Sequence, residues 1–69
     1  MNEPTDAELL KQFRRMHPTY TAATLEKVLC IKRAMSFLVL RSQRLEEYQR
    51  RLLSLYLDLP KDMREKHFT

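Results

Sequence analysis

Residues 37–60 read FLVLRSQRLEEYQRRLLSLYLDLP, and this stretch decides how the rest of the chain can fold. On an ideal helix, apolar side chains spaced three or four residues apart lie along one stripe. Here the stripe consists of Leu38, Leu45, Tyr48, Leu52, Leu55 and Leu59, with Tyr56 beside it. Acid-before-base pairs four residues apart stabilise an exposed helical face by roughly 0.2 to 0.5 kcal/mol each. The opposite side carries two of them, Glu46 with Arg50 and Glu47 with Arg51. The pattern predicts one long helix over residues 37–60.

Arg41 is a charged residue, yet it lies on this apolar stripe, near its upstream end. An unpaired charge is costly to bury. Arg41 therefore requires an acidic partner, a bend that frees it, or another molecule.

The composition predicts an all-α fold. The chain has 69 residues and no glycine, and its prolines, Pro4, Pro18 and Pro60, stand where helices can begin or end. We expect one helical domain, residues 1–69, with frayed ends at 1–4 and 68–69. It should be a small bundle of three to four helices, with a long third helix and a short C-terminal helix. A domain of this size buries only about 60% of its unfolded surface, which leaves room for a partner.

Charge and cysteine usage indicate a cytoplasmic protein. The single Cys30 excludes an internal disulfide framework and suits a reducing compartment. No apolar secretory segment opens the sequence, and the uncharged run at 34–40 is far shorter than the roughly 20 residues that span a bilayer. We therefore expect no membrane partner. The net charge of +4 favours nucleic acid or an anionic protein surface, although an ordinary solvated surface also accounts for it.

The first helix has clear ends. Residues 5–8, TDAE, form a capping-box pattern, and the residue before Pro18 avoids helical geometry. Its apolar face consists of Leu9, Leu10, Phe13 and Met16.

The middle of the chain admits two interpretations. Residues 22–57 contain no strong helix breaker, so local propensity allows one helix of roughly 54 Å, which is too long for so small a compact monomer. The apolar directions of residues 25–35 and 45–59 differ by roughly 150°. A break near residues 33–37 explains this change and makes residues 37–40 a buried helix start. An unbroken helix would instead need a dimer to cover both faces.

The sequence does not predict an enzyme. Cys30 lies among apolar residues and reads as a small core residue, while His17 and His67 stand at helix ends. One cysteine and two distant histidines do not give a zinc-site spacing, and a chain without glycine lacks the usual phosphate-binding loop. We expect no catalytic, cofactor-binding or metal-binding residues, and no cofactor.

Three short blocks carry a family resemblance. The first holds Glu8, Leu9, Leu10, Phe13, Arg14 and Arg15; the second is TLEKV at 24–28; the third holds Arg44, Leu45, Glu47, Leu55, Tyr56, Leu59 and Pro60. In this order they resemble the Hha/YmoA family, small all-helical bacterial proteins that modulate gene silencing with the nucleoid protein H-NS. The match spans most of residues 5–63 and needs a gap between the second and third helices.

The resemblance implies a role and a set of contact residues. It implies a partner-binding set formed by Glu26, Arg41, Ser42 and Arg44. It also implies a DNA-facing set that adds positive charge, formed by Arg14, Arg15, Lys32 and Arg33. The sequence departs from the family at Ala23 and Ser42, where the family has aspartate, and near Arg64, where it has tryptophan.

These observations lead to one hypothesis and one alternative. The hypothesis is a cytoplasmic, nucleoid-associated modulator of transcription that binds an H-NS-like protein and meets DNA indirectly or weakly. If about four of its cations met phosphates directly, log affinity would fall with log salt with a slope near roughly −3.6. The alternative is a homodimeric helical adaptor that packs through the stripe at residues 45–59.

Overall fold

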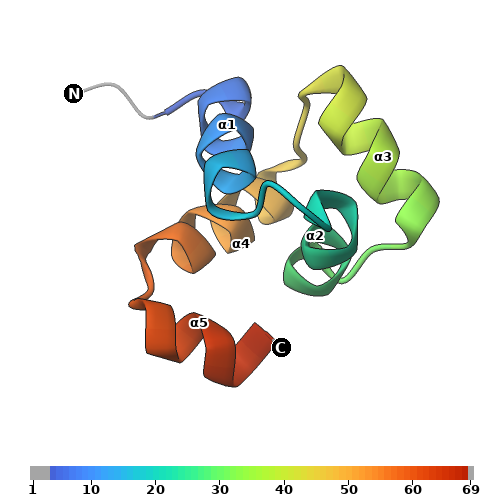
Figure 1. Ribbon diagram of the computed structural model, residues 1–69. Coiled ribbons are helices and arrows are strands. Elements are labelled where there is room, and N and C mark those ends of the chain that lie inside the picture. The colour runs from blue at the N-terminus through green and yellow to red at the C-terminus, as the bar shows by residue number, and fades with distance from the viewer. Residues whose placement is uncertain (1–3, 69) are drawn as a thin grey trace.

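The computed structural model describes residues 4–68, which form helices without strands (Figure 1). The helices are α1 (Asp6–Met16), α2 (Thr21–Leu29), α3 (Arg33–Ser42), α4 (Glu47–Asp58) and α5 (Lys61–Phe68). The predicted all-α class is confirmed. The described residues form five helices where three to four were predicted, because residues 37–60 are divided between two of them, and α5 lies where the short C-terminal helix was predicted. The fraying predicted for residues 1–3 and 69 lies outside the described residues. No helix in residues 4–68 is both long and apolar enough to cross a membrane.

Helix α1 begins and ends where local sequence signals place it. The Glu8 amide donates a hydrogen bond of 3.2 Å to the Thr5 hydroxyl, so Thr5 is the N-cap. The helix stops at His17, one residue before Pro18. The predicted apolar face is confirmed, since its first three members are buried and the fourth is half-buried: Leu9, Leu10, Phe13 and Met16.

The break between α2 and α3 occurs at residues 30–32, just before the predicted window of 33–37. Cys30 adopts the left-handed conformation, with φ 56° and ψ 47°, and its amide donates to the Glu26 carbonyl oxygen. This reversal turns the Cys30 side chain outward. Cys30 is therefore exposed, and its prediction as a core residue is wrong.

A second break makes the predicted long helix over residues 37–60 wrong. Gln43 is left-handed, with φ 56° and ψ 38°, and ends α3. The Leu45 amide then donates to the Asp6 carboxylate at 2.9 Å, and the Glu46 amide donates to the Gln49 side chain at 2.9 Å. In a continuous helix these two amides would donate to backbone carbonyl oxygens of the preceding turn. Here they donate instead to Asp6, which is distant in the sequence, and to the capping side chain of Gln49.

The core is formed mainly by α1, α2 and α4, with one contribution from α3. Its buried apolar residues are Leu9, Leu10, Phe13, Leu25, Val28, Leu29, Val39, Leu45, Leu53 and Tyr56. Helix α4 packs against both α1 and α2. Its buried face consists of Gln49, Leu53 and Tyr56.

The apolar stripe predicted from residues 37–60 is therefore not the buried face. Tyr48 and Leu55 are 52% and 64% exposed, while Leu53, outside the stripe, is fully buried. Neighbouring helical residues point about 100° apart. A rotation of α4 about its axis by one residue therefore buries Gln49, Leu53 and Tyr56 and leaves Tyr48 and Leu55 exposed. The predicted buried start at residues 37–40 is also wrong in part, because Phe37 and Leu38 are more than half exposed.

Helix α5 follows Pro60 and lies at the end of α4 remote from α3 (Figure 1). The Arg64 guanidinium donates to the Leu59 carbonyl oxygen at 2.7 Å and lies 5.9 Å from the centre of the Tyr56 ring. One arginine thus links α5 to the end of α4.

Candidate functional site

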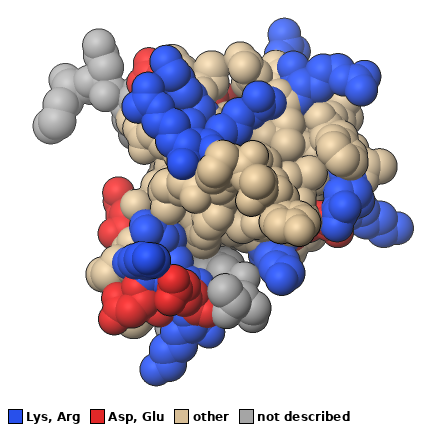
Figure 2. All heavy atoms as spheres, in the orientation of Figure 1, with Lys and Arg blue, Asp and Glu red and all other residues tan. Residues whose placement is uncertain are grey.

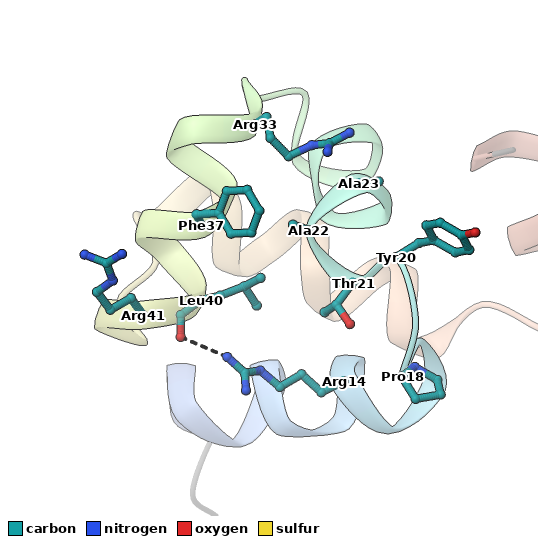
Figure 3. Close-up of a pocket in the computed structure, with 10 residues that line it drawn as sticks. All are labelled: Arg14, Pro18, Tyr20, Thr21, Ala22, Ala23, Arg33, Phe37, Leu40 and Arg41. Carbon is teal, nitrogen blue, oxygen red and sulfur yellow. Dashed lines mark hydrogen bonds between the residues drawn. The ribbon is translucent and has the colours of Figure 1, made fainter.

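An open groove of about 690 Å³ runs between α2, α3 and the connection from α1 to α2 (Figure 3). We call it the arginine groove; it is lined by Arg14, Pro18, Tyr20, Thr21, Ala22, Ala23, Arg33, Phe37, Leu40 and Arg41. Every charged residue in this lining is an arginine.

The floor of the groove depends on one buried polar contact. Ser36 is fully buried, and its hydroxyl donates a 2.7 Å hydrogen bond to the Ala22 carbonyl oxygen. This bond holds α3 against the first turn of α2. Because Ala22 and Ala23 have small side chains, the groove stays open above them (Figure 3).

Two aromatic residues line the groove but are oriented differently. Phe37 is 54% exposed, and its ring faces the Ala22 side of the groove. Tyr20 is 82% exposed and points away from Phe37 (Figure 3). Phe37 is therefore the aromatic surface that an occupant of the groove would meet.

The three arginines differ in their engagement. The Arg14 guanidinium donates to the Leu40 carbonyl oxygen at 3.2 Å, and Arg33 forms an ion pair with Glu26. Within residues 4–68, Arg41 forms no ion pair. Arg41 reaches solvent because α3 ends at the next residue, Ser42, so a bend frees it, which is one of the three solutions its sequence position required.

The structure regroups the residues predicted to bind a partner or to face DNA. Arg41, from the first set, lines the arginine groove with Arg14 and Arg33, from the second. A separate hollow of about 500 Å³ beside α3 and the start of α4 brings together Ser42, Arg44 and Lys32.

Two predicted residues lie outside both of these regions. Glu26 is on α2, with 27% of its side chain exposed, and lines neither hollow, although its pairing with Arg33 places it at the edge of the arginine groove. Arg15 is exposed on α1 and also lines neither. The two predicted sets therefore do not form two separate surfaces.

Sequence reasoning missed Phe37 and Tyr20 as surface residues. Phe37 belongs to an all-apolar run, which predicts burial, and no local signal distinguishes it from the buried Val39. Tyr20 has φ 57°, a left-handed conformation that is unusual for a tyrosine and that starts α2.

A polar and aromatic cluster joins α1, α4 and α5 away from the groove. His17 Nε2 and the Tyr56 hydroxyl oxygen are 2.6 Å apart, and both rings contact Phe13. Burial, assisted by the Arg64 charge, lowers the pKa of His17 from its ordinary value. Burial raises the pKa of Tyr56, against the opposing effect of Arg64. Both shifts favour a neutral pair in which the Tyr56 hydroxyl donates to His17, an arrangement suited to holding α1 and α4 together.

The acidic and basic side chains offer no metal centre in the described part of the chain. Residues 4–68 contain no cluster of three or more His, Cys, Asp or Glu that could hold a metal ion. Asp6 is instead used in packing, because it accepts from Arg50 Nε at 2.7 Å and from the Leu45 amide.

Positive charge is divided among several patches on the face drawn in Figure 2. Lys and Arg side chains gather around a broad uncharged area instead of forming one continuous stripe (Figure 2). This distribution favours contact with a surface that is partly apolar over a pure phosphate track. No protein-family model, curated protein or solved structure matches the chain.

Proposed function

We propose that this chain is a non-enzymatic modulator of transcription that binds an H-NS-like nucleoid protein and adds positive charge near DNA. The observation that carries the proposal is the arginine groove, whose lining combines three arginines with an exposed phenylalanine. Arginine and aromatic side chains are enriched where proteins bind one another. A contact surface of this kind is what a modulator acting by protein association requires.

The residues that carry the Hha/YmoA resemblance support the same proposal. Each of the three blocks contributes to the core: Phe13 from the first, Leu25 from the second and Tyr56 from the third are all buried. A resemblance confined to exposed helix residues would have little structural meaning. Here the buried members of each block lie in the core that α1, α2 and α4 share.

Glu26 has a particular place in this proposal. Its carboxylate is paired with Arg33 across the turn between α2 and α3. A partner arginine would compete with Arg33 for it. Exposed ion pairs contribute about 0 to 1 kcal/mol to folding, and more than half of the Arg33 side chain is exposed. Exchange of partners at Glu26 is therefore compatible with an intact fold.

The homodimeric adaptor receives less support from the packing. Its stripe at residues 45–59 is divided, because Leu45 is buried within the chain while Tyr48 and Leu55 are exposed. A partner helix would meet only part of the stripe.

The test is an NMR titration of the isotopically labelled protein with the amino-terminal dimerisation domain of an H-NS protein. We expect shifts concentrated in α2 and α3 around Glu26. Glu26→Lys should weaken binding by about tenfold or more, whereas Glu47→Lys, which reverses a carboxylate paired with Arg51 on α4, should not. An unchanged spectrum at high domain concentration would reject the proposed partner. Equal affinity of the Glu26→Lys protein would reject the role of Glu26.

A further inference from the structure

The arginine groove differs in charge from four other hollows of the described surface. These four each include a glutamate in their lining: Glu65, Glu46, Glu47 and Glu8 respectively. The arginine groove has three guanidinium groups and no carboxylate among its lining residues. Glu26 compensates Arg33 from the edge. The Arg14 contact is to a neutral carbonyl, and Arg41 has no ion pair in residues 4–68, so both retain uncompensated charge.

Between these charges the groove is apolar. Phe37 is more than half exposed, Leu40 is half-buried, and the methyl groups of Ala22 and Ala23 form the floor. An apolar side chain placed against Phe37 and the two alanines would be removed from water, which favours binding. Charge surrounds an apolar centre, so a complementary ligand needs an apolar group flanked by negative charge.

We infer that the arginine groove binds an acidic segment of a partner protein in which an apolar side chain is flanked by carboxylates. The apolar side chain inserts against Phe37, and the carboxylates meet Arg14 and Arg41. Guanidinium groups suit this role because their planar donors match carboxylate geometry. This inference rests on the proposed function, since it describes the partner's side of that contact.

The lining of the groove supplies cations and no carboxylate, so the carboxylates that meet Arg14 and Arg41 must come from the partner. Glu26, which pairs with Arg33 at the edge of the groove, remains the group that the proposed function assigns to a partner arginine.

A protein segment fits the groove better than single-stranded nucleic acid. Proteins that bind single strands stack successive bases on several aromatic rings along a basic track. Here the Tyr20 ring points away from Phe37 (Figure 3), so one ring faces the groove beside alanine methyl groups. That geometry suits one inserted apolar side chain.

The experiment measures fluorescence anisotropy of labelled short peptides with the full chain. The probe peptide carries a leucine flanked by glutamates. One matched peptide replaces the glutamates by glutamine, and the other replaces the leucine by serine. We expect each replacement to weaken binding by about tenfold or more, because each removes one of the two complementary features.

Protein variants localise the binding. Arg41→Glu and Phe37→Ala should each lower the affinity for the leucine–glutamate peptide by about tenfold. The matched controls are on α4: Arg51→Glu makes the same charge change, and Leu55→Ala truncates another apolar side chain that is more than half exposed. Both control variants should bind the leucine–glutamate peptide with an affinity within about twofold of that of the original chain. Circular dichroism verifies that all four variants retain their helices.

In the peptide and oligonucleotide measurements, three results would overturn the inference: no binding of the leucine–glutamate peptide, equal losses in the α4 controls, or tighter binding of an oligothymidine that is lost in Arg41→Glu. The last result would assign the groove to nucleic acid. Repeating the H-NS domain titration with Phe37→Ala and Arg41→Glu separates this inference from the proposed function. Unaltered domain binding by both variants overturns the groove inference alone. Peptide binding in the groove without any domain binding supports the inference and removes H-NS as the partner.

Discussion

The Ser36 hydroxyl of α3 donates a hydrogen bond to the Ala22 carbonyl oxygen of α2 at 2.7 Å, and Ser36 is fully buried. A buried hydroxyl is costly unless it is paired, so this contact favours one position of α3 against α2. That position separates Phe37 from the alanine floor and sets the width of the arginine groove. One serine therefore connects the packing of the bundle to the candidate binding surface.

Ser36→Ala should destabilise the chain by about 0.5 to 1.5 kcal/mol, the usual net contribution of an intramolecular hydrogen bond. Urea unfolding followed by circular dichroism measures this free energy. Ser42→Ala, at the exposed end of the same helix, is the control and should change stability by less than about 0.5 kcal/mol. A loss no larger than that of the control would show that the bond does not hold α3 in place.

Asp6 should make stability depend on acid pH. Hydrogen bonding to Arg50 lowers the pKa of Asp6 from its ordinary value of 3.8, against the opposing effect of burial. A carboxyl whose pKa is lower in the folded chain contributes stability above about pH 4, and this contribution is lost as pH falls through the lowered pKa. Asp6→Asn should lower the free energy of unfolding at neutral pH by about 1.5 kcal/mol, the low end for a bond to a charged group, because Arg50 is partly exposed.

Unfolding free energies measured from pH 7 to pH 2 test this prediction. The Asp6→Asn protein should lose stability less steeply below pH 4 than the original chain. Glu8→Gln removes a carboxylate at an exposed position of the same helix and controls for net charge. An unchanged acid slope in Asp6→Asn would exclude Asp6 as the group responsible.

His17 should give a second pH dependence, nearer neutrality. Its pKa is lowered from an ordinary value of 6.5, chiefly by burial, so the neutral form is favoured in the folded chain. The associated stability is present above pH 6.5 and is lost as pH falls through the lowered pKa. NMR titration of the imidazole signals, assigned by comparison with His17→Gln, should give a midpoint below 6.5. His17→Gln should also lack this part of the pH dependence of unfolding. A midpoint at or above 6.5 would contradict the buried neutral pair.

Gln43→Gly should stabilise the chain. Gln43 has a left-handed backbone conformation, which costs a residue with a Cβ atom roughly 1 to 2 kcal/mol. Glycine avoids that cost but loses more entropy on folding, by about 0.5 to 1 kcal/mol. A net gain of about 0.5 to 1 kcal/mol is expected in urea unfolding. Ser42→Gly, one residue earlier and inside α3, should instead destabilise by about 0.5 to 1 kcal/mol.

Helix ends set by neighbouring residues were predictable. Thr5 caps α1 through the amide three residues later, and Pro18 and Pro60 stand at helix boundaries. The turns at Cys30 and Gln43 were harder to predict, because each uses a left-handed residue that is not glycine. The amino-acid composition therefore does not indicate where these turns lie. The second turn is also supported by Asp6, which is 39 residues from Leu45 in the sequence.

The sequence indicated which arginines belong to the candidate site, but it did not indicate that they lie on one surface. Arg14, Arg33 and Arg41 were all singled out by the sequence, yet they were assigned to two different sets. Only the packing of α3 on α2 brings them to one groove with Phe37.

By itself the sequence determined the all-α class, the caps of α1, the start of α5 and the excess of positive charge, because these depend on contacts within about four residues or on composition alone. The tertiary structure alone decided where the middle helices end, which face of α4 is buried, and which arginines share a groove. Burial depends on where neighbouring helices lie, and a rotation of one residue, about 100°, exchanges a buried leucine for an exposed one. For that reason Leu53 is fully buried, its sequence neighbour Leu52 is only partly buried, and Leu55 is 64% exposed.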